Sequence, residues 1–102
     1  MSGPSSVRQA VEWVREAVQQ GRYLTHEPHF GRRCRERGMS LADAVHAIRN
    51  ATGCATYDGR APSQDGTNWR VTGPCIEGTT ISVGVEAFLD EQGRTVLLIT
   101  VF

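Results

Sequence analysis

The sequence predicts an α+β domain in which N-terminal helices pack on one face of a roughly four-stranded antiparallel sheet. Apolar residues in the first half of the chain recur with the period of a helix, whereas in the second half they alternate with the period of a strand. Strands that follow helices and are joined by short turns favour an antiparallel sheet with the helices on one side. We therefore expect one layer of helices on one layer of strands.

The length and composition describe one globular domain. The chain has 102 residues, of which 39% are hydrophobic and 22% charged, enough for one modest core and too few for a second domain. No run of about 18 apolar residues could span a bilayer, and residues 1–9 lack the apolar stretch of a signal peptide. We therefore expect a single cytoplasmic domain with no membrane partner.

Charge is unevenly distributed, although the formal net charge is zero. Residues 1–50 contain eight arginines and five acidic residues, and residues 51–102 contain three arginines and six acidic residues. All eleven lysine-or-arginine positions are arginine, which suits bidentate contacts with phosphate. A G+C-rich genome would produce the same bias without selection for binding, so the arginine content alone identifies no site.

The first predicted helix spans residues 6–20 and is followed by a short extended segment, residues 22–26. Ser6 is a suitable N-cap with Gln9 three residues later, and Gly21 can adopt the left-handed conformation that ends a helix. The pattern leaves open whether this helix belongs to the core or docks a partner. Its apolar stripe consists of Val7, Ala10, Val11, Val14 and Val18.

A second, basic helix begins near Pro28, whose fixed φ suits a first turn, and ends at Gly38. Its residues His29, Arg33 and Arg37 are successive i, i+4 neighbours and form one row along the helix. Such a row can hold a phosphodiester: arginines neutralise its charge, and histidine, with an ordinary pKa of about 6.5, acts as general acid or base. A solvated arginine face, with the histidine packed near the helix start, is the alternative.

A third helix begins at Ser40, which has Asp43 at the capping-box position, and ends at Gly53. Glycine is a frequent residue just past the end of a helix because it adopts the left-handed conformation at no steric cost. The expected buried stripe of this helix consists of Leu41, Ala44, Val45 and Ile48.

The second half of the chain contains four strand candidates. Residues 79–89 alternate between apolar and mainly polar positions, which predicts a half-buried strand. Residues 95–102 are apolar on both faces apart from threonines, which predicts a central strand buried on both sides. Residues 54–58 and 68–73 are weaker candidates, separated by the turn-rich residues 59–67. The apolar face of residues 79–89 consists of Ile81, Val83, Val85, Ala87 and Leu89.

The strand region offers a second group of candidate binding residues. Tyr57 and Trp69 are aromatic residues near Arg70, and aromatics beside arginines on a sheet can stack bases and clamp phosphates of single-stranded RNA. Glu86 lies on the polar face of its strand, and Thr100 lies among the apolar residues of the last one. A packing role is the alternative for Trp69, because any small core uses aromatic side chains.

Metal and cofactor sites are not expected. His26 and His29 are three residues apart and Cys34 is near in sequence, but no fourth ligand stands at a usual spacing. With Cys54 and Cys75 the cysteines form no CxxC pair, so we expect reduced, mostly buried thiols. The chain contains no P-loop, dinucleotide fingerprint or nucleophile elbow, which excludes the nucleotide-cofactor and classical hydrolase classes.

Four short motifs resemble the domain-of-unknown-function family numbered 4258. Its members carry an early histidine, an arginine eight residues on in an "eRgis" stretch, an arginine in a central "yrv.G" strand and a closing strand ending near "iTvy". In this chain the matching residues are His29, Arg37 followed by "GMS", Arg70 followed by "VTG", and Thr100 in "LITVF". The resemblance covers residues 22–102 and leaves the first helix as an additional element.

That family is similar to the RelE, BrnT and MqsR toxins, which implies a small antiparallel sheet with helices on one face and metal-independent cleavage of messenger RNA. The implied partners are RNA, free or bound to the ribosome, and a cognate antitoxin protein. This chain contains no lysine, whereas several of those toxins rely on lysines to bind and polarise the RNA backbone. Because arginine is a poor proton donor, an acid/base role would fall to His29, Tyr57 or Glu86.

We therefore expect a RelE-like ribonuclease in which the 2′-hydroxyl attacks the adjacent phosphate. The main alternative is a non-catalytic interaction module with an antitoxin-like or immunity-like role, which the zero net charge favours because RNA-binding proteins are usually more basic. A small metal-dependent enzyme is a third interpretation. The expected catalytic residues are His29, Arg37, Arg70 and Tyr57, and the expected RNA-binding residues are Arg33, Trp69, Glu86 and Thr100.

Overall fold

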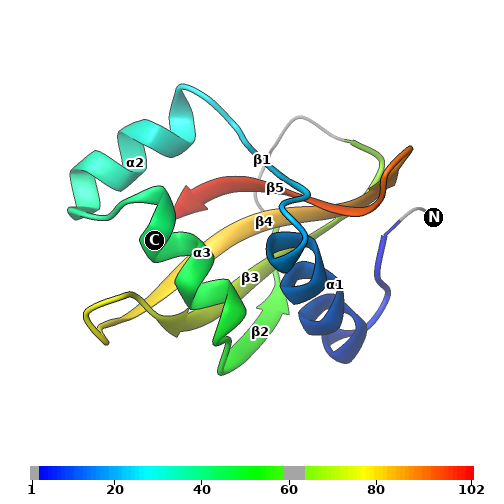
Figure 1. Ribbon diagram of the computed structural model, residues 1–102, viewed down its shortest axis with the longest axis horizontal. Coiled ribbons are helices and arrows are strands. Elements are labelled where there is room, and N and C mark those ends of the chain that lie inside the picture. Colours follow the sequence, from blue (N-terminus) through cyan, green and yellow to red (C-terminus); the bar gives the residue numbers. More distant parts are fainter. Residues whose placement is uncertain (1–2, 59–63) are drawn as a thin grey trace.

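The computed structural model describes residues 3–58 and 64–102, which form three helices and one five-stranded sheet (Figure 1). In chain order the elements are α1 (Val7–Gln19), β1 (Tyr23–Thr25), α2 (His29–Arg37), α3 (Leu41–Arg49), β2 (Gly53–Thr56), β3 (Thr67–Pro74), β4 (Thr80–Asp90) and β5 (Gly93–Val101). The strand order is β1–β5–β4–β3–β2. None of the described helices is long and apolar enough to cross a lipid bilayer.

The α+β class is confirmed, but the prediction of four antiparallel strands is wrong. The short extended segment after α1 is a fifth strand, β1, which pairs parallel to β5 through Tyr23 and Val96, Leu24 and Leu97, and their neighbours. All other pairs are antiparallel. Three residues are too few for a period-2 pattern, and their partner lies far along the chain, so local sequence did not indicate this pairing.

The last strand is internal to the sheet, as predicted. β5 lies between β1 and β4, and its residues 95–101 are buried. The middle strand is β4, because β3 and β2 continue the sheet on its other side. The edges of the sheet are therefore β1 and β2, the two shortest strands.

Two helix starts follow the predicted capping chemistry. The Ser6 hydroxyl accepts the Gln9 N–H at 3.2 Å, and Gly21 takes a positive φ of 72° directly after α1. Ser40 and Asp43 form a complete capping box, in which each side chain accepts the backbone N–H of the other residue. These local signals predicted the helix starts correctly, because an N-terminal cap involves only residues within one helical turn.

The boundaries of the second helix also agree with the sequence, whereas the end of the third does not. α2 lies between Pro28 and Gly38, whose φ of 66° closes the helix in the left-handed region. α3 ends at Arg49 rather than at Gly53. Gly53 is instead the first residue of β2, because its backbone pairs with β3.

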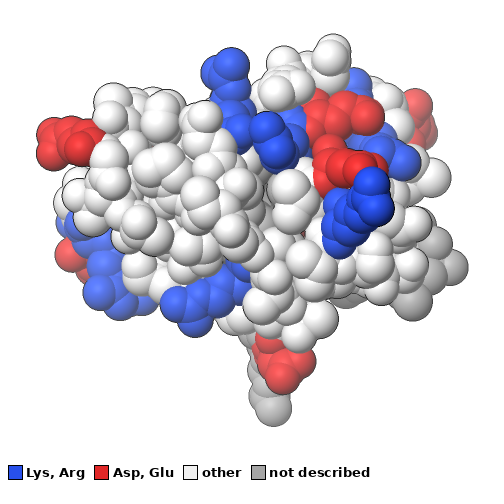
Figure 2. Space-filling view, turned by 90° about the horizontal axis from the view of Figure 1, so that it is seen from below, with Lys and Arg blue, Asp and Glu red and all other residues white. Residues whose placement is uncertain are grey.

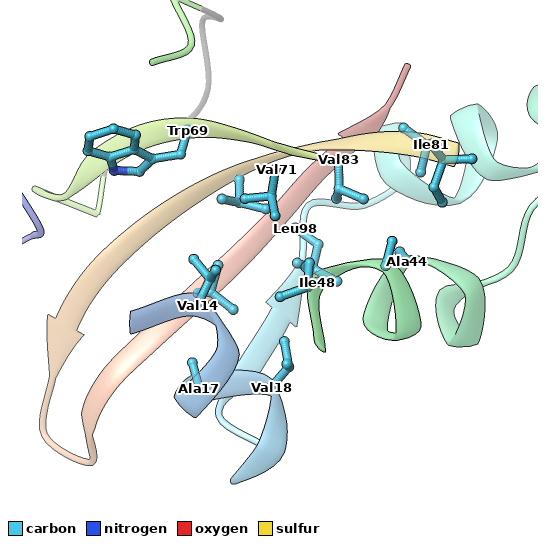
Figure 3. Close-up of a cluster of buried hydrophobic side chains, with 14 of the residues drawn as sticks. Val14, Ala17, Val18, Ala44, Ile48, Trp69, Val71, Ile81, Val83 and Leu98 are labelled. Carbon is cyan, nitrogen blue, oxygen red and sulfur yellow. The ribbon is translucent and has the colours of Figure 1, made fainter. Parts of the chain in front are cut away.

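A single core fills the space between the helices and one face of the sheet. Figure 3 shows Val14 of α1 and Ile48 of α3 beside Leu98 of β5. Phe30 and Cys34 of α2 belong to the same buried cluster. α1 and α3 therefore cover this face of the sheet, and α2 packs beside β5 (Figure 1).

The first helix is part of the core. Val14 and Ala17 are fully buried, and Val18 is 5% exposed, while Val7 in the first turn is 46% exposed. The indole N–H of Trp13 donates to the Thr95 carbonyl at 3.1 Å, which joins α1 to β5. The open question about this helix is thus answered by its packing on the sheet.

The third helix buries the expected stripe with one exception. Ala44 and Ile48 are fully buried as predicted, and Val45 is partly buried and packs against the core. Leu41 is 39% exposed, so the prediction that it belongs to the buried stripe is wrong. The small side chain of the buried Ala47 lets the backbone of α3 approach β3, where a Cβ at Gly73 would overlap the Ala47 carbonyl oxygen.

The fourth strand is buried on both faces in its middle, not half-buried as predicted. Leu89 of the expected apolar face is 53% exposed near the end of β4. On the opposite face Gly84, Glu86 and Phe88 are buried. A second apolar cluster on that face explains the difference, with Phe88, Leu97 and Ile99 buried and Tyr57 packed against them.

The close approach of α3 to β3 generates a stability prediction. In Gly73→Ala the new methyl group would meet backbone atoms of Ala47, which cannot move without shifting the helix. We expect a loss of about 3 kcal/mol in the free energy of unfolding, measured by urea titration. Gly53→Ala is the matched control, because its nearest neighbour would be a side-chain atom at 3.8 Å. Equal stabilities for the two variants would contradict this packing.

The Asp43 carboxylate generates a pH prediction. The N–H of Ile76, followed by the N–H and hydroxyl of Ser40, holds the pKa of Asp43 below its ordinary value of 3.8. A depressed pKa in the folded state means that ionised Asp43 stabilises the fold above the unfolded-state value, and that this contribution is lost as pH falls through the folded-state value. We expect Asp43→Asn to cost about 1 kcal/mol at neutral pH.

The difference in the free energy of unfolding between Asp43→Asn and the wild type should shrink as the pH of the urea titration falls below 3.8. A difference that stays constant over that range would contradict the assignment of three donors to the carboxylate.

Candidate functional site

The candidate site lies on the open face, defined here as the face of the sheet opposite α1 and α3. Arg70 of β3, Gly84 of β4 and Thr100 of β5 are paired in register and form one row across three strands. Gly84 presents no side chain, so the row has a polar residue on each side of a bare backbone. Gly84 is buried and Thr100 is 4% exposed, so Arg70 is the member of this row that is accessible to a ligand.

A β-bulge brings Thr100 into this row. Gly84 pairs with Thr100 and Val85 pairs with Leu98, so Ile99 is an extra residue in β5. The bulge resets the alternation of side chains, and Val101 returns to the core while Thr100 faces the other side. Strict alternation from Leu98 would have placed Thr100 in the core.

Two aromatic rings cover the row at Gly84. Tyr57 and Phe102 meet edge to face, with ring centroids 5.4 Å apart. A Cβ at Gly84 would lie 3.2 Å from the Tyr57 ring and 3.3 Å from the Phe102 ring, so the glycine makes room for both. The rings and the bare strand together form an aromatic surface at the centre of the open face.

Arg70 stands against this aromatic surface. Its guanidinium carbon lies 4.1 Å from the centroid of the Phe102 ring, in cation–π geometry. The Arg70 side chain is exposed and makes no ion pair with any carboxylate in the described residues. Its N–H groups remain available for an anion such as a phosphate.

The second helix joins the same row through Arg33. Its Nε donates to the Thr100 hydroxyl at 3.4 Å, and its Nη1 pairs with the Glu36 carboxylate at 2.9 Å. His29 and Arg37 lie one turn to either side of Arg33 and are exposed. The predicted row on α2 therefore exists, and its middle member contacts the open face.

Glu86 lies in the neighbouring row and is 2% exposed. Its Oε2 accepts the N–H groups of Gln64 at 2.8 Å and Gly66 at 2.9 Å, whereas its Oε1 has no hydrogen-bond partner among the described residues. The carboxylate thus holds residues 64–66 against the sheet. Its burial assigns it a positioning role rather than direct contact with RNA.

Trp69 does not belong to the site. It follows Asn68 and precedes Arg70, and alternation places its ring on the opposite face, among the core residues. The indole is 4% exposed and its N–H donates to the Thr67 hydroxyl at 2.8 Å. Trp69 is therefore too buried to stack a base, so that expectation is wrong. The alternative prediction, a packing role in the core, agrees with the structure.

The structure brings Arg33, Arg70, Thr100 and Tyr57 together, with His29 and Arg37 on the same helix as Arg33. Phe102 contacts both Tyr57 and Arg70, although the sequence did not indicate it as a site residue. The only available signal was an aromatic residue ending an apolar run, and that pattern is also typical of a core strand.

The histidines and cysteines form no metal centre in the described ranges, 3–58 and 64–102. The rings of His26 and His29 are 6.2 Å apart. All three thiols are free, and burial raises the pKa of the Cys34 and Cys54 thiols. Raised pKa values keep these thiols protonated near neutral pH, which disfavours a nucleophilic role.

Charge on the surface is local. Figure 2 shows basic and acidic side chains interspersed toward one end of the molecule, beside a broad area without charged groups. Among the described ion pairs, Glu16 of α1 lies near both Arg22 and Arg94. The face drawn in Figure 2 is therefore not uniformly basic.

A scan against protein-family models, a search of curated proteins and a search of solved structures all find no match to this chain. The resemblance to family 4258 and to the RelE-like toxins stays a prediction from short motifs.

The two hydrogen bonds to Glu86 generate a local prediction. In Glu86→Ala the N–H groups of Gln64 and Gly66 lose their acceptor, so their amide hydrogens should exchange with solvent at least tenfold faster, measured by NMR. Glu86→Gln keeps a side-chain oxygen at the same position and should change these rates less. Unchanged exchange in Glu86→Ala would show that the carboxylate does not hold this segment.

Proposed function

We propose that the chain is a small toxin-like ribonuclease that binds single-stranded RNA on the open face and cleaves it without metal. The observation that supports this proposal is that Arg33 and Arg70 approach one cross-strand row beside the rings of Tyr57 and Phe102, with the buried Thr100 hydroxyl holding Arg33 there. Guanidinium groups next to aromatic rings are the usual means of holding a phosphate and stacking its neighbouring base.

In the proposed reaction the 2′-hydroxyl attacks the adjacent phosphorus and the 5′-oxygen of the next nucleotide leaves. One P–O bond forms and one breaks, giving a 2′,3′-cyclic phosphate and a 5′-hydroxyl. Arg70 and Arg33 stabilise the negative charge that develops on the phosphate oxygens. Because arginine stays protonated, these residues act by charge and hydrogen bonding and not by proton transfer.

Two proton transfers accompany this reaction, one from the 2′-hydroxyl and one to the leaving oxygen. His29 is exposed one turn before Arg33, and Tyr57 lies beside the ring that stacks on Arg70. We assign the acid and base roles to these two residues, since their side chains can both donate and accept a proton. Arg37, on the other side of Arg33, binds a flanking phosphate, and a cognate antitoxin protein neutralises the activity in the cell.

The test is cleavage of a short single-stranded RNA of mixed sequence by the purified protein in buffer containing EDTA. We expect products with 2′,3′-cyclic phosphate ends, identified by mass spectrometry, and an approximately 100-fold lower rate for Arg70→Ala. His29→Ala should lose activity without losing RNA binding. Arg8→Ala is the control, because its side chain is 92% exposed on α1, and it should cleave at the wild-type rate.

Induction in growing cells gives a second readout of the same proposal. The wild-type gene should arrest growth with loss of RNA integrity, and an Arg33→Ala, Arg70→Ala double variant should not. Normal growth with intact RNA, together with no cleavage in vitro, would contradict the ribonuclease proposal.

A second candidate function is a non-catalytic interaction module of a toxin system. The observations that favour it are the zero net charge and an exposed apolar pocket beside α3, lined by Leu41 and Ile76 among others. A protein that neutralises a partner needs an accessible apolar surface more than it needs a basic one. Harmless expression with intact RNA would support this function over the first.

A further inference from the structure

The outward side of α3 carries a pocket that the core does not use. It has a volume of about 420 Å³ and is lined by Tyr23 of β1, by Leu41, Val45 and Arg49 of α3, and by Ile76 of the β3–β4 turn. Leu41 and Ile76 are 39% and 59% exposed. Leu41 and Ile76 thus give the pocket an accessible apolar surface. It is called here the α3 pocket.

The outer edge of β1 lies beside the α3 pocket and has unpaired backbone groups. The N–H of Val96 donates to the Arg22 carbonyl at 3.2 Å, and the N–H of His26 donates to the Leu98 carbonyl at 2.9 Å. In a parallel pair alternate residues face the partner, so the N–H and C=O groups of Tyr23 and Thr25 point away from β5. Within the described chain these four groups have no hydrogen-bond partner.

The edge strand is only three residues long, but it lacks the charges and prolines that also block further pairing. β1 contains no charged residue and no proline, and Leu24 is 54% exposed on the open-face side. Tyr23 lies on the core side, where it lines the α3 pocket. A strand added outside β1 would therefore place alternate side chains over the α3 pocket and beside Leu24.

We propose that β1 and the α3 pocket bind an extended segment of a partner protein, which adds to the sheet as a sixth strand. An apolar side chain of the segment fills the pocket, and a carboxylate one or two residues away pairs with Arg49. Backbone hydrogen bonds to the edge supply affinity, and the pocket supplies specificity. The partner surface is thus an apolar, acidic strand.

Charge complementarity selects this occupant over a second copy of the chain. Arg49 is exposed and forms no ion pair with a carboxylate among the described residues, so it is available to an acidic partner. In a symmetric dimer through β1 the nearest carboxylate of the other copy would be that of Glu27, two residues beyond Thr25, and it already accepts the Gly31 N–H at 2.9 Å. A carboxylate that is free to pair with Arg49 therefore comes from a different sequence.

The inference concerns a surface away from the Arg70 row and does not depend on whether the open face cleaves RNA. Its test uses the full chain labelled with ¹⁵N and the blocked peptide acetyl-Thr-Val-Leu-Val-Glu-Thr-amide as the probe. We expect NMR shifts at Tyr23, Thr25, Leu41 and Val45 that saturate as the peptide is added. The same peptide N-methylated at alternate residues, which lacks the edge-pairing donors, should produce none of them.

A charge exchange tests the role of Arg49. Arg49→Glu should weaken binding of the glutamate peptide about tenfold, and a peptide with lysine in place of the glutamate should restore it. Leu89→Ser is the control, because Leu89 is as exposed as Leu24 but lies at the far end of β4. This variant should bind the glutamate peptide like the wild type. A variant that had only lost stability would bind both peptides weakly, so recovery with the lysine peptide shows that the charge of residue 49 is responsible.

Three outcomes would overturn the proposal: no shifts at millimolar peptide, shifts that do not centre on β1 and α3, or equal binding of the N-methylated peptide. A chain that forms dimers by size exclusion, with the same residues shifting on dilution, would assign the surface to a second copy. RNA cleavage is measured separately, so its absence would leave this result unaffected.

Discussion

The β-bulge between β4 and β5 is the constraint on which both the core and the candidate site depend. It inserts Ile99 opposite the Gly84–Val85 step, so Leu98 and Val101 both reach the helix-covered face although they are three residues apart. The same insertion turns Thr100 to the open face beside Gly84. One extra residue therefore completes the core and brings a hydroxyl into the row that contains Arg70.

Two glycines determine how closely neighbouring parts of the chain approach the sheet. Gly73 allows the backbone of α3 to contact β3, and Gly84 allows two aromatic rings to lie on β4. The first contact draws the alanine face of α3 toward the core and leaves Leu41 at the surface. The second creates the aromatic support for Arg70. A core contact and a surface site thus have the same cause, a strand position without a side chain.

The two proposed surfaces share one stretch of chain. β1 ends at Thr25, and α2 begins at His29, so the edge that offers hydrogen bonds leads directly into the helix that carries Arg33. A partner bound along β1 would lie next to the start of α2. The two proposed surfaces are therefore neighbours along the chain.

The sequence by itself determined the helices, their caps and the α+β class, because capping and amphipathic periods depend on residues within a turn or two of one another. It also indicated the row of His29, Arg33 and Arg37 along α2. It did not determine that residues 23–25 form a parallel edge strand, that α3 exposes Leu41, or that Trp69 is buried while Phe102 joins Arg70. Tertiary structure decided these features, because each depends on pairing register, a bulge or the approach of two backbones between residues distant in the chain.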